Sequence, residues 1–542
     1  SESFEMVTVA DYSFIVNKTK TVGYRDTGIA EPHGYGNWFF PDNWTASGDE
    51  TRYYAPLAGT DKFSVQTLED LPDDDDPSPP SEDDFYTIQG DADGGFSKYY
   101  VIYVDGVWQE THARNLSVTL DEETMPHALV RETDGDFHLR HFGWVPRLFG
   151  DAMSNKNPSF VGKKIRDVGY YKNRLTFAAG ENIIFSGAGD YGNFYRNTVT
   201  QLLDSDVVDI AVSSQKVSTI NYILPAENGM MFFSDQTQFV LNIDELLTPS
   251  TGSIDVATTY EMNPNVKPIA VGADVYYVTE TGDFSRVREY GLSIGDEIAT
   301  DATDITAHVP RYLPKGLRRL AGSSNEDIML AISSETGFDN RVYVYKFFYA
   351  NGQKVQSAWS YWKFADDDII LDVSILNNVI YFIIERADGV FLETMNVQST
   401  DFPLALTYDL LLDRRYNFAG GDKSFDSTDT TFTLPYTLTE DEQDDFRLIL
   451  GDGDTAGRML DYSNYTWVDS DHVKYVGDFT SVEVFGGLNY VLRYEFSQQF
   501  NRRSDGVAIT TGRYQLRTFT IVYENMAFFS TEAIPMGTTT RP

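Results

Sequence analysis

A short pattern of apolar and polar positions recurs along the chain: an apolar strand, a polar turn and a second apolar strand. It first occurs as MVTVADYSFIVN over residues 6–17. Five further copies follow, at residues 167–180, 222–235, 269–282, 319–333 and 372–385. Each copy combines alternating apolar positions with a short polar break, which is typical of a β-hairpin. The pattern therefore predicts six antiparallel hairpins.

The spacing of these copies indicates how the hairpins are organised. From the second copy onward the starts lie about 50 residues apart, which is typical of β-propeller blades. Each blade is a small antiparallel sheet that cannot bury both of its faces alone. An ordinary β-sandwich with several similar hairpins is the alternative. We predict a mainly β fold built on a propeller, with a first segment at 1–17 and the remaining blades at 161–400.

Residues 18–160 interrupt the repeat and predict an inserted domain. They contain LPDDDDPSPPSEDD at 71–84, a Pro-broken acidic run that cannot bury itself and is expected to be a solvated loop. The segment YYVIYVDGV at 99–107 alternates and turns at Asp105–Gly106, which predicts a hairpin. The insertion is therefore expected to contain strands of its own.

Residues 401–542 lack the repeat and carry longer β patterns instead. We expect them to form an additional C-terminal β domain. The sequence TEDE at 439–442 has the spacing of a helix capping box, and the alternatives there are one short helix or an acidic turn. No other helix is predicted.

Composition supports a β protein and excludes several functions. Aromatic residues make up 14% of the 542 residues and glycine occurs 41 times, which favours strands joined by tight turns. Asp and Glu number 82 against 42 Lys and Arg, and this net charge of −40 argues against affinity-driven binding to DNA. The chain has no cysteine, which excludes disulfides and thiolate chemistry. No run of about 18 apolar residues occurs, so neither a transmembrane helix nor a signal peptide is expected.

Three motifs in the sequence are candidates for chemistry. The glycine-rich GAGDYG at 187–192 fits a dinucleotide-binding pattern, but the following sequence lacks the crossover helix that such a site needs, so a turn is expected. His138 and His141 have ligand-like spacing, but residues three apart on a strand point to opposite faces. We therefore expect no shared zinc between these two histidines.

Carboxylate pairs are the third motif. Asp91 with Asp93, and Asp452 with Asp454, resemble fragments of calcium loops but lack the terminal Glu. A pair close enough for glycoside hydrolysis will arise by chance among 82 acids. We predict turns at both positions, and no catalytic, cofactor-binding or metal-binding residue in the chain.

Long phrases of the sequence carry a family resemblance from residue 5 to about residue 525. They resemble, in the same order, the tail tubular protein B family, the nozzle proteins of short-tailed bacteriophages with a single-subunit RNA polymerase. The phrases are EMVTVADYSFIVN (5–17), ETMPHALVRETDGDF (123–137), NPSFVGKKIRDVGYYKNRLTF (157–177), GENIIFS (180–186), SDQTQFVL (234–241), DITAHVPRYLPKG (304–316), VYKFFYANGQKVQSAWSYWKF (344–364), LNYVLRYEFSQQF (488–500) and GRYQLRTFTIVYEN (512–525).

The resemblance implies a structural protein of the virion, located at the distal end of the tail. It implies a homo-hexameric ring that docks on the upper tail ring, formed by tail tubular protein A, and helps to hold the tail fibre protein. It also implies contact with the host cell envelope and a channel through which genomic double-stranded DNA passes without tight binding. The alternatives are a tail-associated enzyme that degrades capsule or peptidoglycan and, less favoured, an isolated propeller that binds glycans.

Basic residues are sparse, so their clusters are the candidate contacts with DNA in a channel or with a neighbouring subunit. The sequence does not distinguish these two roles from plain solvation. The candidates are Lys163, Lys164, Arg166, Arg311, Lys315, Arg318, Arg319, Arg414, Arg415, Arg502 and Arg503.

Overall fold

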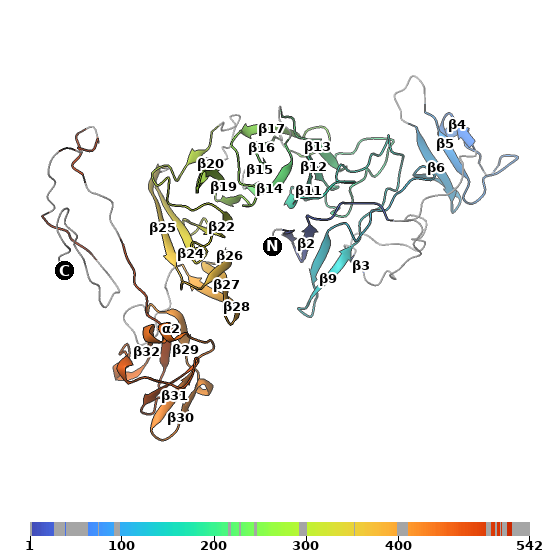
Figure 1. Ribbon diagram of the computed structural model, residues 1–542. Helices are drawn as coiled ribbons and strands as arrows, with labels where there is room; N and C mark the ends of the chain where they lie inside the picture. The colour runs from blue at the N-terminus through green and yellow to red at the C-terminus, as the bar shows by residue number, and fades with distance from the viewer. Residues whose placement is uncertain are drawn as a thin grey trace. The chain divides into compact units, whose positions relative to one another are not determined.

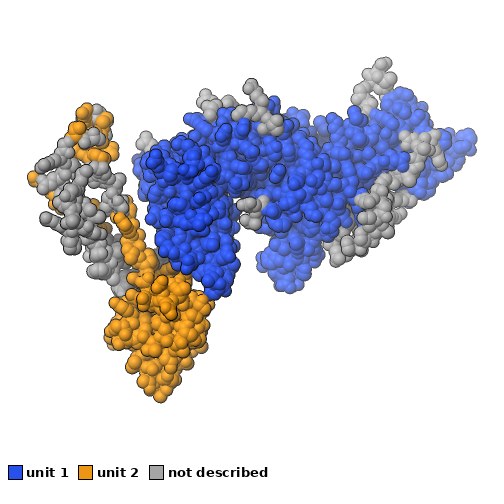
Figure 2. All heavy atoms as spheres, viewed as in Figure 1, with its two compact units in different colours: residues 1–395 blue, residues 396–542 orange. Residues whose placement is uncertain are grey.

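The computed structural model consists mainly of antiparallel β-sheets (Figure 1). It divides into two compact units, residues 1–395 and residues 396–542 (Figure 2). The boundaries expected at 17, 160 and 400 stay a prediction. The residues that the structure describes are 3–25, 38–39, 63–73, 75–90, 98–214, 218–226, 229–242, 246–291, 301–351, 353–397, 410–494, 500–504, 507–509, 511 and 517–522.

Six sheets follow one another along the first unit, and we number them sheets 1 to 6. Sheet 1 has the strand order β1-β2-β8-β9-β3, and in sheets 2 to 6 the strands are in chain order. The strands of sheets 1 to 3 are β1 (Phe4–Val9), β2 (Tyr12–Asn17), β8 (His127–Arg131), β9 (Phe137–Phe142), β3 (Trp38–Phe39); β10 (Asp167–Tyr171), β11 (Arg174–Ala179), β12 (Asn182–Phe185), β13 (Val208–Ala211); and β14 (Ile220–Ala226), β15 (Gly229–Ser234), β16 (Gln238–Asn242), β17 (Ser253–Thr258). Those of sheets 4 to 6 are β18 (Ile269–Val271), β19 (Asp274–Thr281), β20 (Phe284–Gly291), β21 (Thr303–Asp304); β22 (Leu317–Ser323), β23 (Ile328–Ser333), β24 (Arg341–Ala350), β25 (Gln353–Lys363); and β26 (Ile369–Leu376), β27 (Val379–Arg386), β28 (Gly389–Asn396).

The six predicted hairpins are confirmed. Each of them forms the first two strands of one sheet, from β1–β2 in sheet 1 to β26–β27 in sheet 6. Sheet 1 is completed by β8 and β9, which lie in the segment expected to be an insertion. The repeated phrase therefore marks where each sheet begins.

Successive sheets pack through their first strands, with β1 against β10 and so on through β14, β18, β22 and β26. Glycine allows close approach at two of these contacts. A Cβ on Gly169 in β10 would lie 2.8 Å from Cγ2 of Ile223 in β14, and one on Gly322 in β22 would lie 2.5 Å from Cγ2 of Val271 in β18. Neither distance leaves room for a side chain, so both glycines are needed for the packing.

The apolar core lies between the sheets. One cluster joins sheets 1 and 2 through rings that include Phe14, Phe142 and Phe177, and others join sheets 2 and 3, 3 and 4, and 4 and 5. As a result β11, β15 and β23, second strands of inner sheets, are buried along their whole length. In sheets 1 and 6 the second strands β2 and β27 alternate instead between more and less buried positions. The outward faces of sheets 1 and 6 are therefore less covered than the faces of the inner sheets.

A separate four-stranded sheet lies between β3 and β8 in the chain. It consists of β4 (Phe63–Val65), β5 (Phe85–Ile88), β6 (Tyr99–Val104) and β7 (Val107–Thr111). The predicted turn at Asp105–Gly106 is confirmed, since both residues have positive φ angles of 51° and 80°. The acidic run at 71–84 is held near its ends, because the Trp108 indole donates to the carbonyl of Pro72 and the main chain of Asp84 accepts from Tyr103. Between these two points residues 75–79 are exposed.

The second unit packs two sheets around one core, which includes Phe418, Phe432 and Phe446. Of the two alternatives left open at TEDE, the structure has the short helix, α2 (Glu440–Asp445), where the side chains of Thr439 and Glu442 cap each other's backbone N–H. The strands are β29 (Asp413–Asn417), β35 (Val484–Leu488), β32 (Phe446–Leu450) in one sheet and β30 (Lys423–Phe425), β31 (Asp429–Thr433), β34 (His472–Val476), β33 (Thr466–Trp467) in the other. The 3₁₀ helices of the two units are η2 (Leu68–Asp70), η3 (Gly420–Asp422), η4 (Gly453–Thr455) and η5 (Tyr462–Asn464). No helix in the described part of the chain has the length and apolarity required to cross a bilayer.

A buried charge network connects the first four sheets. The ammonium of Lys267, just before β18, lies 2.8 Å from a carboxylate oxygen of Glu5 in β1 and 2.9 Å from one of Asp167 in β10. The other Asp167 oxygen accepts from the backbone N–H of Ile223 in β14, at 2.7 Å. Burial raises the pKa of Asp167, whereas at Lys267 the two carboxylates outweigh the effect of burial and raise its pKa.

We expect Lys267→Met to destabilise the first unit by about 3 kcal/mol, because it leaves the fully buried carboxylate of Asp167 without its cation, whereas Glu5 keeps its ion pair with Lys18. Thermal unfolding of the full chain measures the effect. Lys363→Met is the matched control: Lys363 pairs with the exposed Asp366, and its loss should change stability by no more than about 0.5 kcal/mol. Equal melting temperatures for the two variants would contradict a structural role for the network.

Candidate functional site

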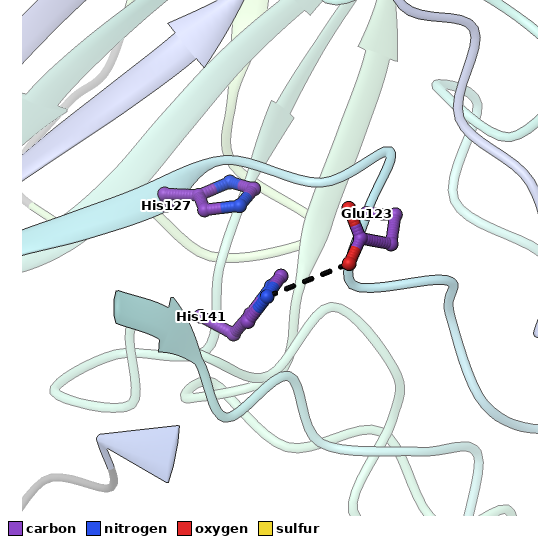
Figure 3. Close-up of side chains that lie close together, drawn as sticks. All are labelled: Glu123, His127 and His141. Atoms are coloured by element: carbon purple, nitrogen blue, oxygen red, sulfur yellow. Dashed lines mark ion pairs between the residues drawn. The ribbon is translucent and has the colours of Figure 1, made fainter. Parts of the chain in front are cut away.

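Two histidines face each other on the outward face of sheet 1. His127 in β8 is the direct cross-strand partner of His141 in β9, and their ring centroids are 4.5 Å apart (Figure 3). Both side chains are half-buried. The β8–β9 hairpin fixes this pairing, because residues directly opposite each other on antiparallel strands project from the same face.

A carboxylate approaches the two rings from the turn that precedes β8. The backbone N–H groups of Thr124 and Met125 donate to the carbonyl of Asp121, which closes this turn and presents Glu123. An oxygen of Glu123 lies 3.6 Å from Nε2 of His141 (Figure 3). One potential ligand atom from each of Glu123, His127 and His141 lies within 4.8 Å of the others.

Local contacts define the state of the two rings. Nδ1 of His127 is 3.2 Å from the carbonyl of Met125, so in the neutral ring this nitrogen carries the hydrogen and Nε2 keeps its lone pair. Burial, followed by the neighbouring His141, lowers the pKa of His127. Nδ1 of His141 is buried and has no hydrogen-bond partner among the described residues. The site therefore offers a neutral imidazole, a second imidazole and an exposed carboxylate.

Sequence reasoning missed this site because it compared the wrong histidines. It paired His138 with His141 by their spacing, whereas the structure places His138 opposite Val130 and His141 opposite His127. The register follows from a hairpin turn within ETDGDF, about which residues 127 and 141 are symmetric. The turn sequence ETDGDF is the signal from which the pairing of His127 with His141 could have been predicted.

A second cluster of ligand-type side chains lies in the second unit. Nδ1 of His472 is 2.8 Å from a carboxylate oxygen of both Asp469 and Asp471. The hydrogen bond that Asp469 accepts from the ring is the main cause that raises the pKa of His472. Asp469 also accepts from the backbone N–H groups of Asp471 and His472, so these contacts form a hydrogen-bonded turn.

Several of the candidate basic residues contact other parts of the chain. Arg318 in β22 donates to the carbonyls of Ile370 and Leu371 in β26, and Nε of Arg319 lies 3.2 Å from Asp372. These two arginines therefore hold sheet 6 against sheet 5. Lys163 lies 3.3 Å from the amide oxygen of Asn182, and Lys164 pairs with Thr21 in an isolated bridge.

In the second unit the guanidinium of Arg414 is almost completely buried and lies 2.7 Å from Glu442, while Arg415 donates to the carbonyl of Leu410. Arg502 and Arg503 are exposed. In the first unit, Arg166 directly precedes β10, and Arg311 and Lys315 lie between β21 and β22. A role for any of these residues in a channel stays a prediction.

The remaining motifs form turns where they are described. In GAGDYG, Gly187 and Asp190 form a bridge across the turn, and β12 is followed by the antiparallel β13. A Cβ on Gly192 would lie 2.7 Å from the carbonyl oxygen of Gly143. The half-buried Asp452 precedes η4 and the exposed Asp454 lies within it, while Asp91 and Asp93 lie outside the described residues.

Comparison with known proteins identifies a phage family. The sequence profile of the bacteriophage nozzle protein family matches residues 55–541. The chain is 30% identical over 462 residues to tail tubular protein gp12 of Escherichia phage T7, a match that covers 83% of this chain and 58% of that protein. The chain thus spans less than two thirds of the length of this relative.

Solved structures show weaker likenesses. Hsv2 of Kluyveromyces lactis is 7% identical with a TM-score of 0.32, over 56% of this chain and 70% of that one. The β-propeller domain of Cps50 (Swd1) from Myceliophteria thermophila is 10% identical with a TM-score of 0.28, over 50% and 83% of the two chains. TM-scores of this size do not establish a shared fold.

We expect Arg414→Met to destabilise the second unit by about 2 kcal/mol, because Glu442 loses a charge-assisted hydrogen bond in a buried setting. Urea unfolding of the full chain measures this change in stability, and hydrogen exchange of the backbone amides in β32 and β35 shows whether it falls in the second unit. The exposed Arg502→Met is the control and should alter stability by no more than about 0.5 kcal/mol. If the backbone amides of β32 and β35 exchange as slowly in Arg414→Met as in the parent, the ion pair between Arg414 and Glu442 has no structural role.

Proposed function

We propose a function for this chain from its family: it belongs to the bacteriophage nozzle proteins and is a structural component of a phage tail. In this proposal six copies form a closed ring at the distal end of a short tail. The ring docks on the upper tail ring of tail tubular protein A, helps to hold the tail fibre protein and contacts the host cell envelope. Genomic double-stranded DNA leaves through its channel. The observation that carries the proposal is the family match across residues 55–541.

The charge of the chain supports a conduit that does not grip its cargo. Binding of duplex DNA through several Lys or Arg side chains would oppose sliding of the duplex and would weaken steeply with salt. This chain has a net charge of −40, and Arg318, Arg319 and Arg414 make internal contacts. The channel wall is therefore proposed to repel the phosphates over most of its length, so that the genome passes without tight binding.

Mixing the chain with tail tubular protein A should give closed six-fold rings in negative-stain electron microscopy, because head-to-tail contacts form a ring only when the rotation closes. The rings should retain no duplex DNA at physiological salt. A chain that stays monomeric at every concentration with that partner present would contradict the nozzle proposal. Release of new reducing ends from capsule or peptidoglycan would favour the glycan-degrading alternative.

For the fold we propose that sheets 1 to 6 are the blades of a propeller, closed by contact between the outward face of sheet 6 and the part of the outward face of sheet 1 that lies outside the His127–His141 pair. Phe4, Met6 and Leu139 are exposed on the outward face of sheet 1, and Leu376 and Ile383 on that of sheet 6. Apolar faces of this kind need a partner, because a blade cannot bury both faces alone. The contacts of first strands along the whole series support this arrangement.

Ile383→Glu should therefore destabilise the chain by about 2 kcal/mol, because a carboxylate would be buried against sheet 1 in the closed propeller. Val256→Glu is the matched control: Val256 lies in β17, the last strand of sheet 3, and is 42% exposed where Ile383 is 38% exposed. Thermal unfolding of both variants gives the comparison. The same small change in both would mean that the outward face of sheet 6 stays in water.

A further inference from the structure

We propose that Glu123, His127 and His141 form a binding site for one divalent transition-metal ion of the zinc class. Two imidazoles and one carboxylate are a ligand set that zinc proteins use, with a fourth position left for water. The inference rests on the hairpin geometry and does not depend on the nozzle role.

The distances between the potential ligand atoms fit two ligands of one ion better than a hydrogen bond between them. Ligand atoms bound about 2.0 Å from a tetrahedral zinc lie about 3.3 Å from one another. The oxygen of Glu123 lies 3.6 Å from Nε2 of His141, which is too long for a hydrogen bond and close to this spacing. The third ligand atom, on His127, lies within 4.8 Å of both. A small movement of the exposed Glu123 side chain would complete the geometry.

The frame around the ligands is already set by the backbone. The antiparallel register holds the two rings on one face of sheet 1, and the turn at 121–125 holds Glu123 over them (Figure 3). The hydrogen bond from Nδ1 of His127 to the carbonyl of Met125 selects the tautomer whose Nε2 can bind an ion. On His141 the nitrogen that faces Glu123 is Nε2, at 3.6 Å, so the ring already presents this ligand atom to the site.

The second cluster differs in a way that makes it a useful reference. In Asp469, Asp471 and His472 the ring nitrogen is already hydrogen-bonded to both carboxylates at 2.8 Å. An ion would have to replace these bonds, whereas the 3.6 Å contact between Glu123 and Nε2 of His141 is too long to be a hydrogen bond that an ion would have to break. We therefore assign the metal to sheet 1 and use the second cluster only to correct for weak binding elsewhere.

A bound ion would connect the turn at 121–125 to the β8–β9 hairpin. Any ligand that binds only the folded state stabilises it in proportion to the logarithm of its concentration over Kd. The expected consequence is local, because both connected segments belong to sheet 1 or directly precede it. Zinc should raise the melting temperature of the first unit and slow hydrogen exchange in β8 and β9.

The test is calorimetric titration of ZnCl₂ into the full chain without an affinity tag, in a His472→Gln background that disables the second cluster. We expect saturable binding of one zinc ion per chain. His127→Ala and His141→Ala should each weaken binding at least tenfold. His138→Ala is the matched control, since His138 lies on the same strand but on the opposite face, and it should bind as the parent does.

A spectroscopic readout distinguishes a built site from surface binding. Co²⁺ in place of zinc should give the visible absorption of a tetrahedral ion in the parent and in His138→Ala, and not in His127→Ala or His141→Ala. If a histidine variant fails to fold, Glu123→Gln decides, because this exposed substitution keeps the hairpin and should still weaken zinc binding. Absence of saturable binding in the parent, or equal affinity in folded His127→Ala, would overturn the proposal.

Discussion

The structure of the first unit depends on one constraint: a β-sheet with two apolar faces cannot expose either of them to water. Three second strands of the inner sheets, β11, β15 and β23, are buried on both faces along their whole length. Each inner sheet therefore needs a neighbour on both sides, and the chain supplies these neighbours in sequence order. The same constraint makes the outward faces of the two terminal sheets the part of the unit that requires a further partner.

Charges buried by this packing have to be compensated across sheet boundaries. Lys267 joins Glu5 and Asp167 from three separate segments, and the guanidinium of the buried Arg174 in β11 donates to the carbonyl of Leu247, between β16 and β17, at 3.2 Å. Such contacts add less net stability than apolar burial, but each leaves a costly unpaired group if one partner is removed. They therefore favour one arrangement of neighbouring sheets over alternatives with similar apolar packing.

The strong negative charge and the sheet packing serve different parts of the proposed role. Interlocking sheets give rigidity without disulfides, in a chain that has no cysteine. The charge keeps a phosphate-rich cargo from adhering to the wall that these sheets build. The metal proposed at the β8–β9 hairpin would add a local constraint on sheet 1, where one face of the sheet is less covered than in the inner sheets.

The sequence alone determined the six hairpins and the turn at Asp105–Gly106, and at α2 it showed the capping residues without deciding between a helix and a turn. These follow from alternation, positive-φ turns and capping within a few residues, so neighbouring letters contain the information. Only the tertiary structure decided that β2 pairs with β8, that His127 meets His141 and that Arg318 reaches β26. Such contacts join residues that are distant in the chain or depend on an exact register, and a local pattern cannot specify which faces and edges meet.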